Sequence, residues 1–105
     1  MVESLDRLGL VGNASLIKTI QKQAGSDVDV TIVFSAKVLK LNKRGQEQPR
    51  FMIITQDAVY NFKELSKYRR RIALVSIASL SISTLSNEMI LHVPSEYDYK
   101  YKTVR

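Results

Sequence analysis

The spacing of apolar residues changes from helical to alternating near residue 25 of this 105-residue chain. Four apolar residues recur at helical spacing and predict a short helix, namely Leu16, Ile17, Ile20 and Ala24. Asn13 stands before them as an N-cap, because its side-chain oxygen can accept a hydrogen bond from an unpaired backbone N–H of the first turn. Gly25 follows and is expected to end the helix, because glycine readily adopts the left-handed backbone conformation. We therefore predict a helix over residues 14–24.

Beyond the helix, short apolar runs alternate with turn residues about every ten residues. Seven strands are predicted, in VDVTIVFSAKVLKLN (from Val28), FMIIT, DAVYNF, KYRRRIAL, ASLSIS, EMILHV and YDYKYKT. In the first turn, NKRGQEQP, Gly45 is free to adopt positive φ and Pro49 marks the far side. Strands this close together, with no helix between them, indicate antiparallel hairpins and an all-β sandwich or small barrel.

The length predicts one domain over residues 1–105. We divide it into an N-terminal helical prefix, 1–26, and a β-barrel module, 27–105. The prefix is not a domain of its own, because about 25 residues cannot bury a separate core.

The positive charge of the chain is concentrated in its middle. The net charge is +6, and residues 30–71 carry ten Lys/Arg against three acids, a local excess of +7. A one-sided basic field attracts phosphate-rich partners, either lipid headgroups or nucleic acid, although basic segments are also commonly solvated faces. The first ten residues lack the apolar core of a signal peptide, and no apolar run reaches the roughly 20 residues of a membrane span, so we expect a cytoplasmic protein.

Residues that could support catalysis are sparse. His92 is the single histidine, and the chain contains no cysteine that could partner it in nucleophilic or metal chemistry. No acid pair has the spacing of an acid–base dyad, and neither G-x-x-x-x-G-K-[ST] nor G-x-G-x-x-G occurs. We expect a structural role for His92 and a non-enzymatic protein with no metal and no cofactor.

Two C-terminal segments have a pattern typical of strands. In SLSISTLSN, alternation places Leu80, Ile82 and Leu85 on one face and the serines on the other, which predicts a half-buried strand and turn. In YDYKYK, the three tyrosines at positions 97, 99 and 101 share a face. We expect them to cover one end of a barrel core, and base stacking in a nucleic-acid reader is the alternative.

The stretch KLNKRGQEQPR offers the clearest candidate site. If Lys40 ends one strand and Arg50 begins the next, the hairpin brings them close together, with Lys43 and Arg44 on the turn between them. Arginine can hold phosphate in a bidentate manner and lysine acts as a point charge, so four converging cations predict a phosphate-binding site. The alternative is a solvated turn.

A second basic cluster, Arg69-Arg70-Arg71, is expected to contribute secondarily to the basic field. Strand alternation predicts that Arg69 and Arg71 face one way and Arg70 the other.

The order of these motifs resembles the membrane-binding tail-homology domain of class I myosins. The matching residues are Lys40, Asn42 to Gly45, Pro49-Arg50, Phe51 to Thr55, Tyr60, Arg71 to Leu74, Ile82 to Ser86 and His92 to Pro94, within residues 33–99. The resemblance implies a pleckstrin-homology-like fold, which is a partly open seven-stranded antiparallel barrel capped by a helix. It also implies that Lys40 and Arg50 hold a headgroup, with Lys43 and Arg44 between them.

The sequence departs from this family in one respect. The family barrel is followed by a C-terminal helix that plugs one end, but here the sequence ends at Thr103-Val104-Arg105. Either the chain is cut, or the N-terminal helix covers that opening, or a partner does.

The leading hypothesis is a module that binds anionic phospholipids, including phosphoinositides, and anchors a cytoskeletal motor at the inner leaflet of membranes. The alternative is a protein-interaction module of the actin cytoskeleton on the same scaffold, without a specific lipid pocket. Nucleic acid ranks third, because the basic segment has few interleaved aromatics, Tyr60 and Tyr68.

Overall fold

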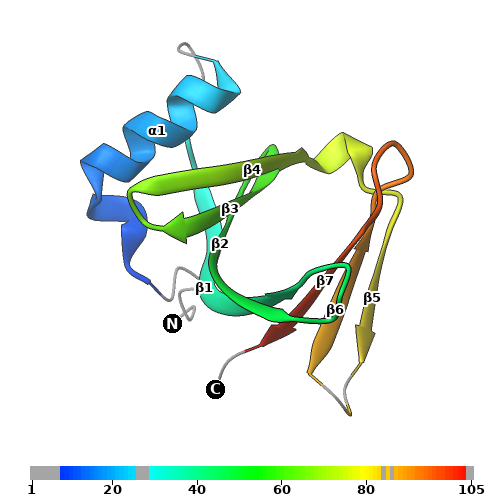
Figure 1. Cartoon of the computed structure of the whole chain (residues 1–105). Helices are drawn as coiled ribbons and strands as arrows, with labels where there is room; N and C mark the ends of the chain where they lie inside the picture. Colours follow the sequence, from blue (N-terminus) through cyan, green and yellow to red (C-terminus); the bar gives the residue numbers. More distant parts are fainter. Residues whose placement is uncertain (1–7, 26–28, 84, 86, 104–105) are drawn as a thin grey trace, which may run out of the picture.

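A computed structural model describes residues 8–25, 29–83, 85 and 87–103 (Figure 1). Its elements, in chain order, are η1 (Leu10–Gly12), α1 (Ala14–Ala24), β1 (Ile32–Leu41), β2 (Glu47–Thr55), β3 (Ala58–Glu64), β4 (Lys67–Ala73), η2 (Leu74–Ser76), β5 (Ser79–Ser83), β6 (Glu88–His92) and β7 (Asp98–Thr103). No helix in the described part of the chain is long and apolar enough to cross a membrane.

The seven strands form one antiparallel sheet in the order β4-β3-β2-β1-β7-β6-β5. The sheet curls so that η2 joins its two edge strands, β4 and β5 (Figure 1). The expected partly open seven-stranded antiparallel barrel is therefore confirmed, and no helix follows β7 in the described residues. β1 also pairs with β7 in antiparallel orientation, and Lys40 lies opposite Tyr101.

Two strand boundaries differ from the prediction. β1 begins at Ile32, after Val30, and Val28 lies outside the described residues. β2 begins at Glu47, so Pro49 is inside the strand and pairs in register with Leu39 of β1. Proline is tolerated there because the pairing of β2 with β3 starts only at Phe51, which leaves the N–H side of Pro49 without a ladder partner.

The predicted helix α1 and its caps are confirmed. The Asn13 side chain accepts a hydrogen bond from the Leu16 N–H at 3.1 Å, and Gly25 ends the helix with φ at 120°, in the region that favours glycine. Leu16 and Ile20 are buried on the sheet, in a cluster with residues such as Ile53 of β2.

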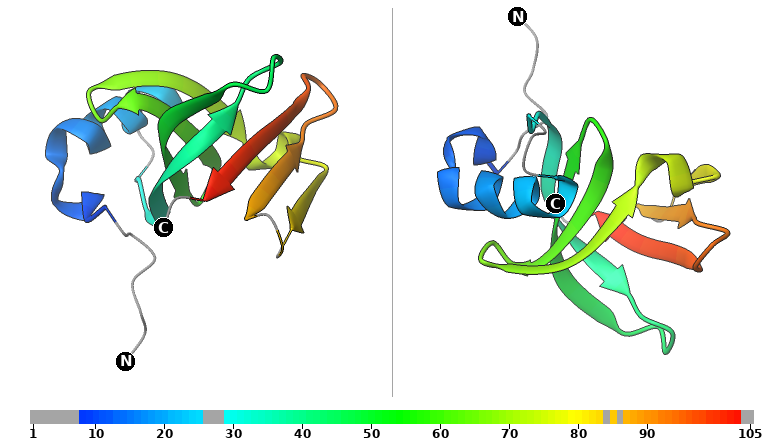
Figure 2. Two further views of the ribbon diagram at one scale, coloured as in Figure 1. Left: turned by 60° about the horizontal axis from the view of Figure 1, so that its bottom comes forward. Right: turned by 90° about the horizontal axis from the view of Figure 1, so that it is seen from above.

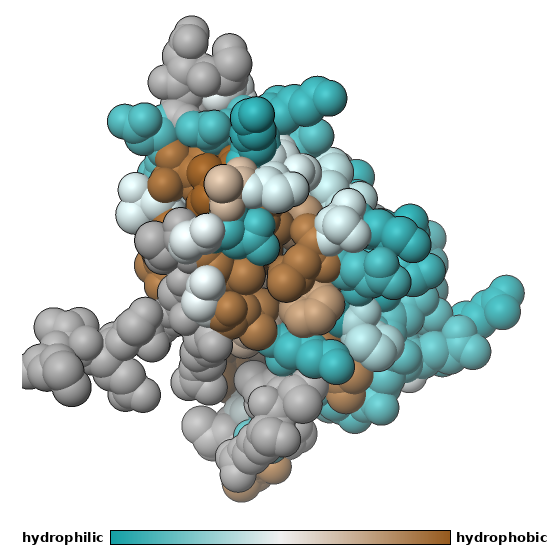
Figure 3. Space-filling model, turned by 90° about the vertical axis from the view of Figure 1, so that its left-hand side faces the viewer, coloured by the Kyte–Doolittle hydropathy of each residue, from teal (hydrophilic) through white to brown (hydrophobic). Residues whose placement is uncertain are grey.

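Helix α1 covers the outer face of the β1–β4 part of the sheet. Its apolar cluster includes Tyr60 and Phe62 of β3, and both views of Figure 2 place α1 and the β5–β7 strands on opposite sides of β1–β4. Partly buried apolar residues such as Leu8 and Leu65 surround this cluster, and hydrophobic surface appears on the α1 side of the molecule (Figure 3). The interpretation that the N-terminal helix covers the barrel opening is therefore wrong.

The inner face of the curled sheet holds the second apolar cluster. Its buried members are Val38, Met52, Val59, Ile72, Leu91, Val93, Tyr99 and Tyr101. The expected role of the tyrosine run is confirmed for Tyr99 and Tyr101, whereas Tyr97 precedes β7 and is about half exposed, at 49%.

An apolar hollow of about 270 Å³ opens beside this inner cluster, between residues of β2, β3 and η2 on one side and of β5 and β6 on the other. Leu80 of β5 lines it but is 51% exposed, and Ile82 is 67% exposed. The prediction of a half-buried strand and turn is therefore wrong, since the side chains of Leu80, Ile82 and Leu85 are all exposed. The reason is topological: β5 is an edge strand with a partner on one side alone, and no described element covers it.

Candidate anion-binding site

The turn between β1 and β2 is closed by the side chain of Asn42. Its Oδ1 accepts hydrogen bonds from the backbone N–H groups of Arg44 and Gln46, each at 2.9 Å. Its Nδ2 donates to the Gln46 side chain, also at 2.9 Å. Gly45 adopts φ of 76°, as its sequence position predicted. These bonds hold Lys43 and Arg44 on an ordered five-residue turn rather than on a loose loop.

A hollow of about 220 Å³, which we call the arginine hollow, lies at the hairpin end of the inner face. Its walls are formed by polar, charged and tyrosine side chains, namely Lys40, Gln48, Arg50, Asn61, Arg69, Arg70, Tyr97 and Tyr99. Lys40 and Arg50 therefore meet in one hollow, as the hairpin argument expected. Four cations face this volume, and two of them come from β4 rather than from the hairpin turn.

A β-bulge on β4 is the reason that two neighbouring arginines reach this hollow. Asn61 of β3 pairs with Arg70, but the next residue, Phe62, pairs with Tyr68, which leaves Arg69 as the extra residue. A bulge interrupts the alternation of side chains along a strand. Arg69 and Arg70 consequently line the same hollow, so the prediction that Arg69 faces away from Arg70 and with Arg71 is wrong.

Arg71 lies on the other face of the sheet. Its Nε donates to the Tyr60 hydroxyl at 3.1 Å, and its guanidinium carbon lies 5.9 Å from the centroid of the Tyr60 ring. Tyr60 belongs to the apolar cluster under α1. Of the predicted secondary patch, Arg69 and Arg70 thus join the arginine hollow and Arg71 does not.

Arg70 is held in place by a small polar network. Its Nε donates to the Tyr99 hydroxyl at 2.9 Å, and its Nη2 forms an ion pair with the Glu96 carboxylate. The same Tyr99 hydroxyl donates to Glu96 Oε1 at 2.9 Å. Burial raises the pKa of Tyr99 to about 12, although Arg70 acts in the opposite direction. Tyr99 therefore keeps its proton at neutral pH and can serve both partners.

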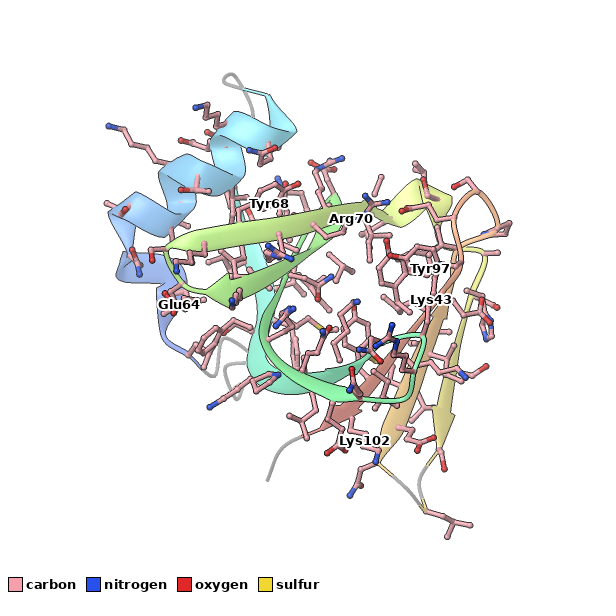
Figure 4. All side chains as sticks on the ribbon, viewed as in Figure 1. Lys43, Glu64, Tyr68, Arg70, Tyr97 and Lys102 are labelled. Carbon is pink, nitrogen blue, oxygen red and sulfur yellow. The ribbon has the colours of Figure 1, made fainter. Side chains whose placement is uncertain are left out.

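A second hollow, which we call the lysine hollow, adjoins the first across Lys40 and Tyr97. It measures about 280 Å³ and is lined by Lys40, Leu41, Asn42, Lys43, Tyr97, Asp98 and Lys100. Figure 4 shows Lys43 and Tyr97 close together, with Arg70 on β4 and with Tyr68 and Glu64 toward α1. Tyr97, which lines both hollows, stacks on Tyr99 of the arginine hollow with ring centroids 4.6 Å apart.

The four cations predicted to surround a single headgroup are thus divided between two hollows and the turn. Lys40 faces both hollows, Arg50 the arginine hollow and Lys43 the lysine hollow, while Arg44 lies outside the walls of both. The prediction missed several wall residues: Gln48, Asn61, Tyr97, Tyr99, Asp98 and Lys100. Gln48 was predicted in the turn and lies in β2. The other five were predicted in strands, but only the register between distant strands shows that they meet there.

Several of these cations are unneutralised. Among the described residues, Lys40, Lys43, Arg50, Arg69 and Lys100 make no ion pair. Unpaired cations in a shared concave surface create a local positive potential that favours anions. The described residues contain no group of His, Asp and Glu that could hold a metal ion.

His92 has cross-strand partners on the outer face of the sheet. Its Nε2 lies 2.9 Å from Ser81 Oγ on β5, and its Nδ1 lies 3.2 Å from Asp98 Oδ1 on β7. The three residues link three neighbouring strands, which is the kind of structural role that the sequence predicted.

Comparisons with known proteins identify the family. The profile of a family described as "Unconventional myosin tail, actin- and lipid-binding" matches residues 5–105. The chain belongs to the unconventional myosin tail family. The resemblance drawn from the hairpin and strand motifs is thereby confirmed.

One relative is the myosin heavy chain IB of Acanthamoeba castellanii. The chain is 35% identical to it over an aligned length of 88 residues, which covers 77% of this chain and 8% of the heavy chain. The chain therefore spans a small part of that relative. As an unconventional myosin tail domain it is a non-catalytic module of an actin- and lipid-binding family.

Proposed function

We propose that this tail domain docks on the anionic cytoplasmic leaflet by holding a phosphoinositide headgroup in the arginine hollow, and thereby anchors a motor protein to membranes. The observation that supports this is the meeting of Lys40, Arg50, Arg69 and Arg70 on one concave surface. Arginine pairs with phosphate through two parallel hydrogen bonds, and lysine adds a point charge. The site would sit at the periphery of the bilayer, in the cytoplasm, where anionic lipids are concentrated.

The hairpin supplies the ordering that a specific site requires. Because Asn42 fixes the turn and the ladder fixes the backbone of Lys40 and Arg50, little loop entropy remains to be lost on binding. Each basic residue near such a surface contributes about 1 kcal/mol, so four give an attraction of about 4 kcal/mol before ordering costs. Lys43 and Arg44 would add to that attraction from the turn.

Actin binding stands beside lipid binding in the family description, so a protein partner is not an exclusive alternative. We assign the arginine hollow to lipid because its walls carry unpaired cations and few exposed apolar groups. A protein-docking surface would more often present an apolar core inside a polar rim.

The test is co-sedimentation with vesicles that contain a phosphatidylinositol bisphosphate or phosphatidylserine. Lys40→Ala/Arg50→Ala is expected to weaken binding to the bisphosphate vesicles by about 30-fold, which corresponds to about 2 kcal/mol. Lys18→Ala/Lys22→Ala is the matched control, because it removes the same charge from the exposed side of α1. Equal losses in the two double variants would contradict a headgroup site and leave only diffuse attraction.

A further inference from the structure

The two edges of the sheet differ in the features that keep an edge strand from pairing with another chain. β4, at one edge, has a bulge and four cations, which are Lys67, Arg69, Arg70 and Arg71. β5, at the other edge, reads Ser-Leu-Ser-Ile-Ser and has no charge, no proline and no break in its register with β6. Charges, prolines and bulges are the usual means of protecting an edge strand. β4 is therefore protected, whereas β5 is open to an additional strand.

β5 lies at the margin of the molecule and is accessible along its length. Its backbone pairs with β6, and no described strand pairs with it on the other side (Figures 1 and 2). The residues from Ser79 to Ile82 are all exposed. Leu80 also lines the apolar hollow, and Ile82 lies two positions further along the same face of the strand. This edge therefore offers backbone hydrogen-bonding groups together with two apolar side chains.

The sequence of β5 reads almost the same in both directions. Leu80 and Ile82 are isomers placed symmetrically about Ser81. Two β5 strands paired antiparallel about this centre set Ser81 opposite Ser81, and Leu80 of each copy opposite Ile82 of the other. Directly opposite side chains lie on one face of a sheet and contact each other. The edge is thus complementary to itself, as a two-fold interface requires, because the same patch serves both partners.

The charge distribution allows two copies to meet at this edge. Each chain has a net charge of +6, and residues 30–71 carry an excess of +7. Residues 72–105, which include β5, contain three Lys/Arg and three Asp/Glu and are neutral. Like charges placed together across an interface oppose association. Contact through β5 brings two neutral segments together, at the opposite end of the strand order from the cationic β4.

We infer that β5 is a self-association edge, at which a second copy of this domain pairs antiparallel with β5 and joins the two sheets in a two-fold dimer. Ile82 of the second copy then lies beside Leu80 and extends the apolar wall of the hollow, which removes both side chains from water. Neither the arginine hollow nor the lysine hollow contains a residue of β5. The inference therefore goes beyond the proposed lipid binding and does not depend on it.

The association should be weak and reversible. A pair of five-residue strands buries less than the roughly 1,000 Å² of a stable interface, so we expect a dissociation constant of about 0.1–1 mM. Added salt should strengthen the association, because it screens the repulsion between two chains that each carry a net charge of +6.

Sedimentation equilibrium of the chain without lipid, up to about 1 mM protein, measures the dimerisation. Ser81→Lys places two like charges directly opposite each other at the two-fold axis and should weaken dimerisation by about fivefold or more. Ser81→Ala loses the same hydroxyl, and with it the contact to His92, but adds no charge, so it should dimerise like the wild-type protein. Ser15→Lys adds the same charge on the exposed side of α1 and should weaken dimerisation by about twofold or less.

A charge-exchange pair tests the register. Ser81→Glu alone should also dimerise weakly, because two carboxylates would face each other. A mixture of Ser81→Lys and Ser81→Glu places opposite charges at the centre and should form a heterodimer at least about fivefold more readily than either variant dimerises alone. Thermal unfolding of each variant checks that it remains folded.

Three results would overturn the inference. A wild-type protein that stays monomeric at about 1 mM excludes a second copy as the partner of β5, and vesicle binding that still depends on Arg50 would then leave the proposed membrane docking intact. A dimer that Ser81→Lys does not weaken would place the interface elsewhere on the molecule. A mixture of the lysine and glutamate variants that gains nothing would exclude the register centred on Ser81.

Discussion

The inner face of the barrel has two ends that come from the same four strands. On each strand a buried apolar residue stands two positions from a wall residue of the arginine hollow: Val38 and Lys40, Met52 and Arg50, Val59 and Asn61, and Ile72 and Arg70. Because the strands are antiparallel, each of these steps leads toward the hairpin end. The apolar end supplies stability and the cationic end supplies recognition, although both are parts of one continuous surface.

The largest effect is expected at the apolar end. Ile72 is 1% exposed, so Ile72→Ala should lower the free energy of unfolding by about 2–5 kcal/mol, because it removes buried methyl groups and leaves a cavity. Val75, in the neighbouring η2, is 96% exposed, and Val75→Ala should change the free energy of unfolding by less than about 0.5 kcal/mol. Urea unfolding measures both, and a small loss for Ile72→Ala would show that this end is not the core.

Two buried tyrosines, Tyr99 and Tyr101, lie at the boundary between the two ends, and they should make the free energy of unfolding fall at alkaline pH. Burial raises the pKa of Tyr99 to about 12 and that of Tyr101 further, from an ordinary value of 10.0. The folded state thus retains protons that the unfolded state loses. Stability is fully present below pH 10 and falls as pH rises toward 12, by up to about 1.4 kcal/mol per pH unit for each tyrosine.

This decline can be measured by urea unfolding at successive pH values. Tyr101→Phe should flatten it, because one of the two titrating groups is gone. The variant should also be less stable at neutral pH by about 1 kcal/mol, because the Tyr101 hydroxyl donates to Asn61 Oδ1 at 3.0 Å. An unfolding free energy that stays level between pH 10 and 12 would contradict the burial of both tyrosines.

At the cationic end, two adjacent arginines provide a matched pair. Arg70→Ala should weaken binding to bisphosphate vesicles about tenfold, since it removes a wall residue and leaves Glu96 unpaired beside the site. Arg71→Ala removes the same charge from the opposite face and should weaken binding about twofold or less. Similar losses for both variants, measured by co-sedimentation, would mean that net charge alone decides binding.

The smallest effect is expected from the carboxylate beside the cationic end. Glu96→Gln should strengthen binding of soluble inositol trisphosphate by about two- to threefold, because it removes a negative charge that partly neutralises Arg70. Glu64→Gln makes the same charge change in an ion pair with Lys67 on the β3–β4 turn. Titration calorimetry of both variants measures the difference. Weaker binding by Glu96→Gln would instead assign Glu96 the role of orienting Arg70.

The local elements were predictable because local patterns determine them. The helix over 14–24 followed from its apolar spacing and from Asn13, and the seven strands followed from alternation and turn residues. The hairpin argument also placed Lys40 and Arg50 together correctly, since two-stranded register depends on one short turn.

The parts that could not be predicted depend on contacts between distant strands. Tyr97 and Asp98 join the candidate sites because β7 pairs with β1, some sixty residues earlier in the chain. The exposure of Leu80 depends on β5 being an edge of the sheet. The side on which α1 packs is not contained in its amphipathic pattern, which shows only that one of its faces is buried.

The β4 bulge has a consequence for how related chains are compared. Between Tyr68 and Ile72 stand three identical residues, and a sequence alignment can place a one-residue gap anywhere among them at equal cost. In space the three are not equivalent, because Arg69 is the inserted residue and its loss would leave Arg70 as the one β4 arginine that faces the hollow. A relative with two arginines here could thus differ sharply in lipid affinity while its alignment shows a neutral deletion.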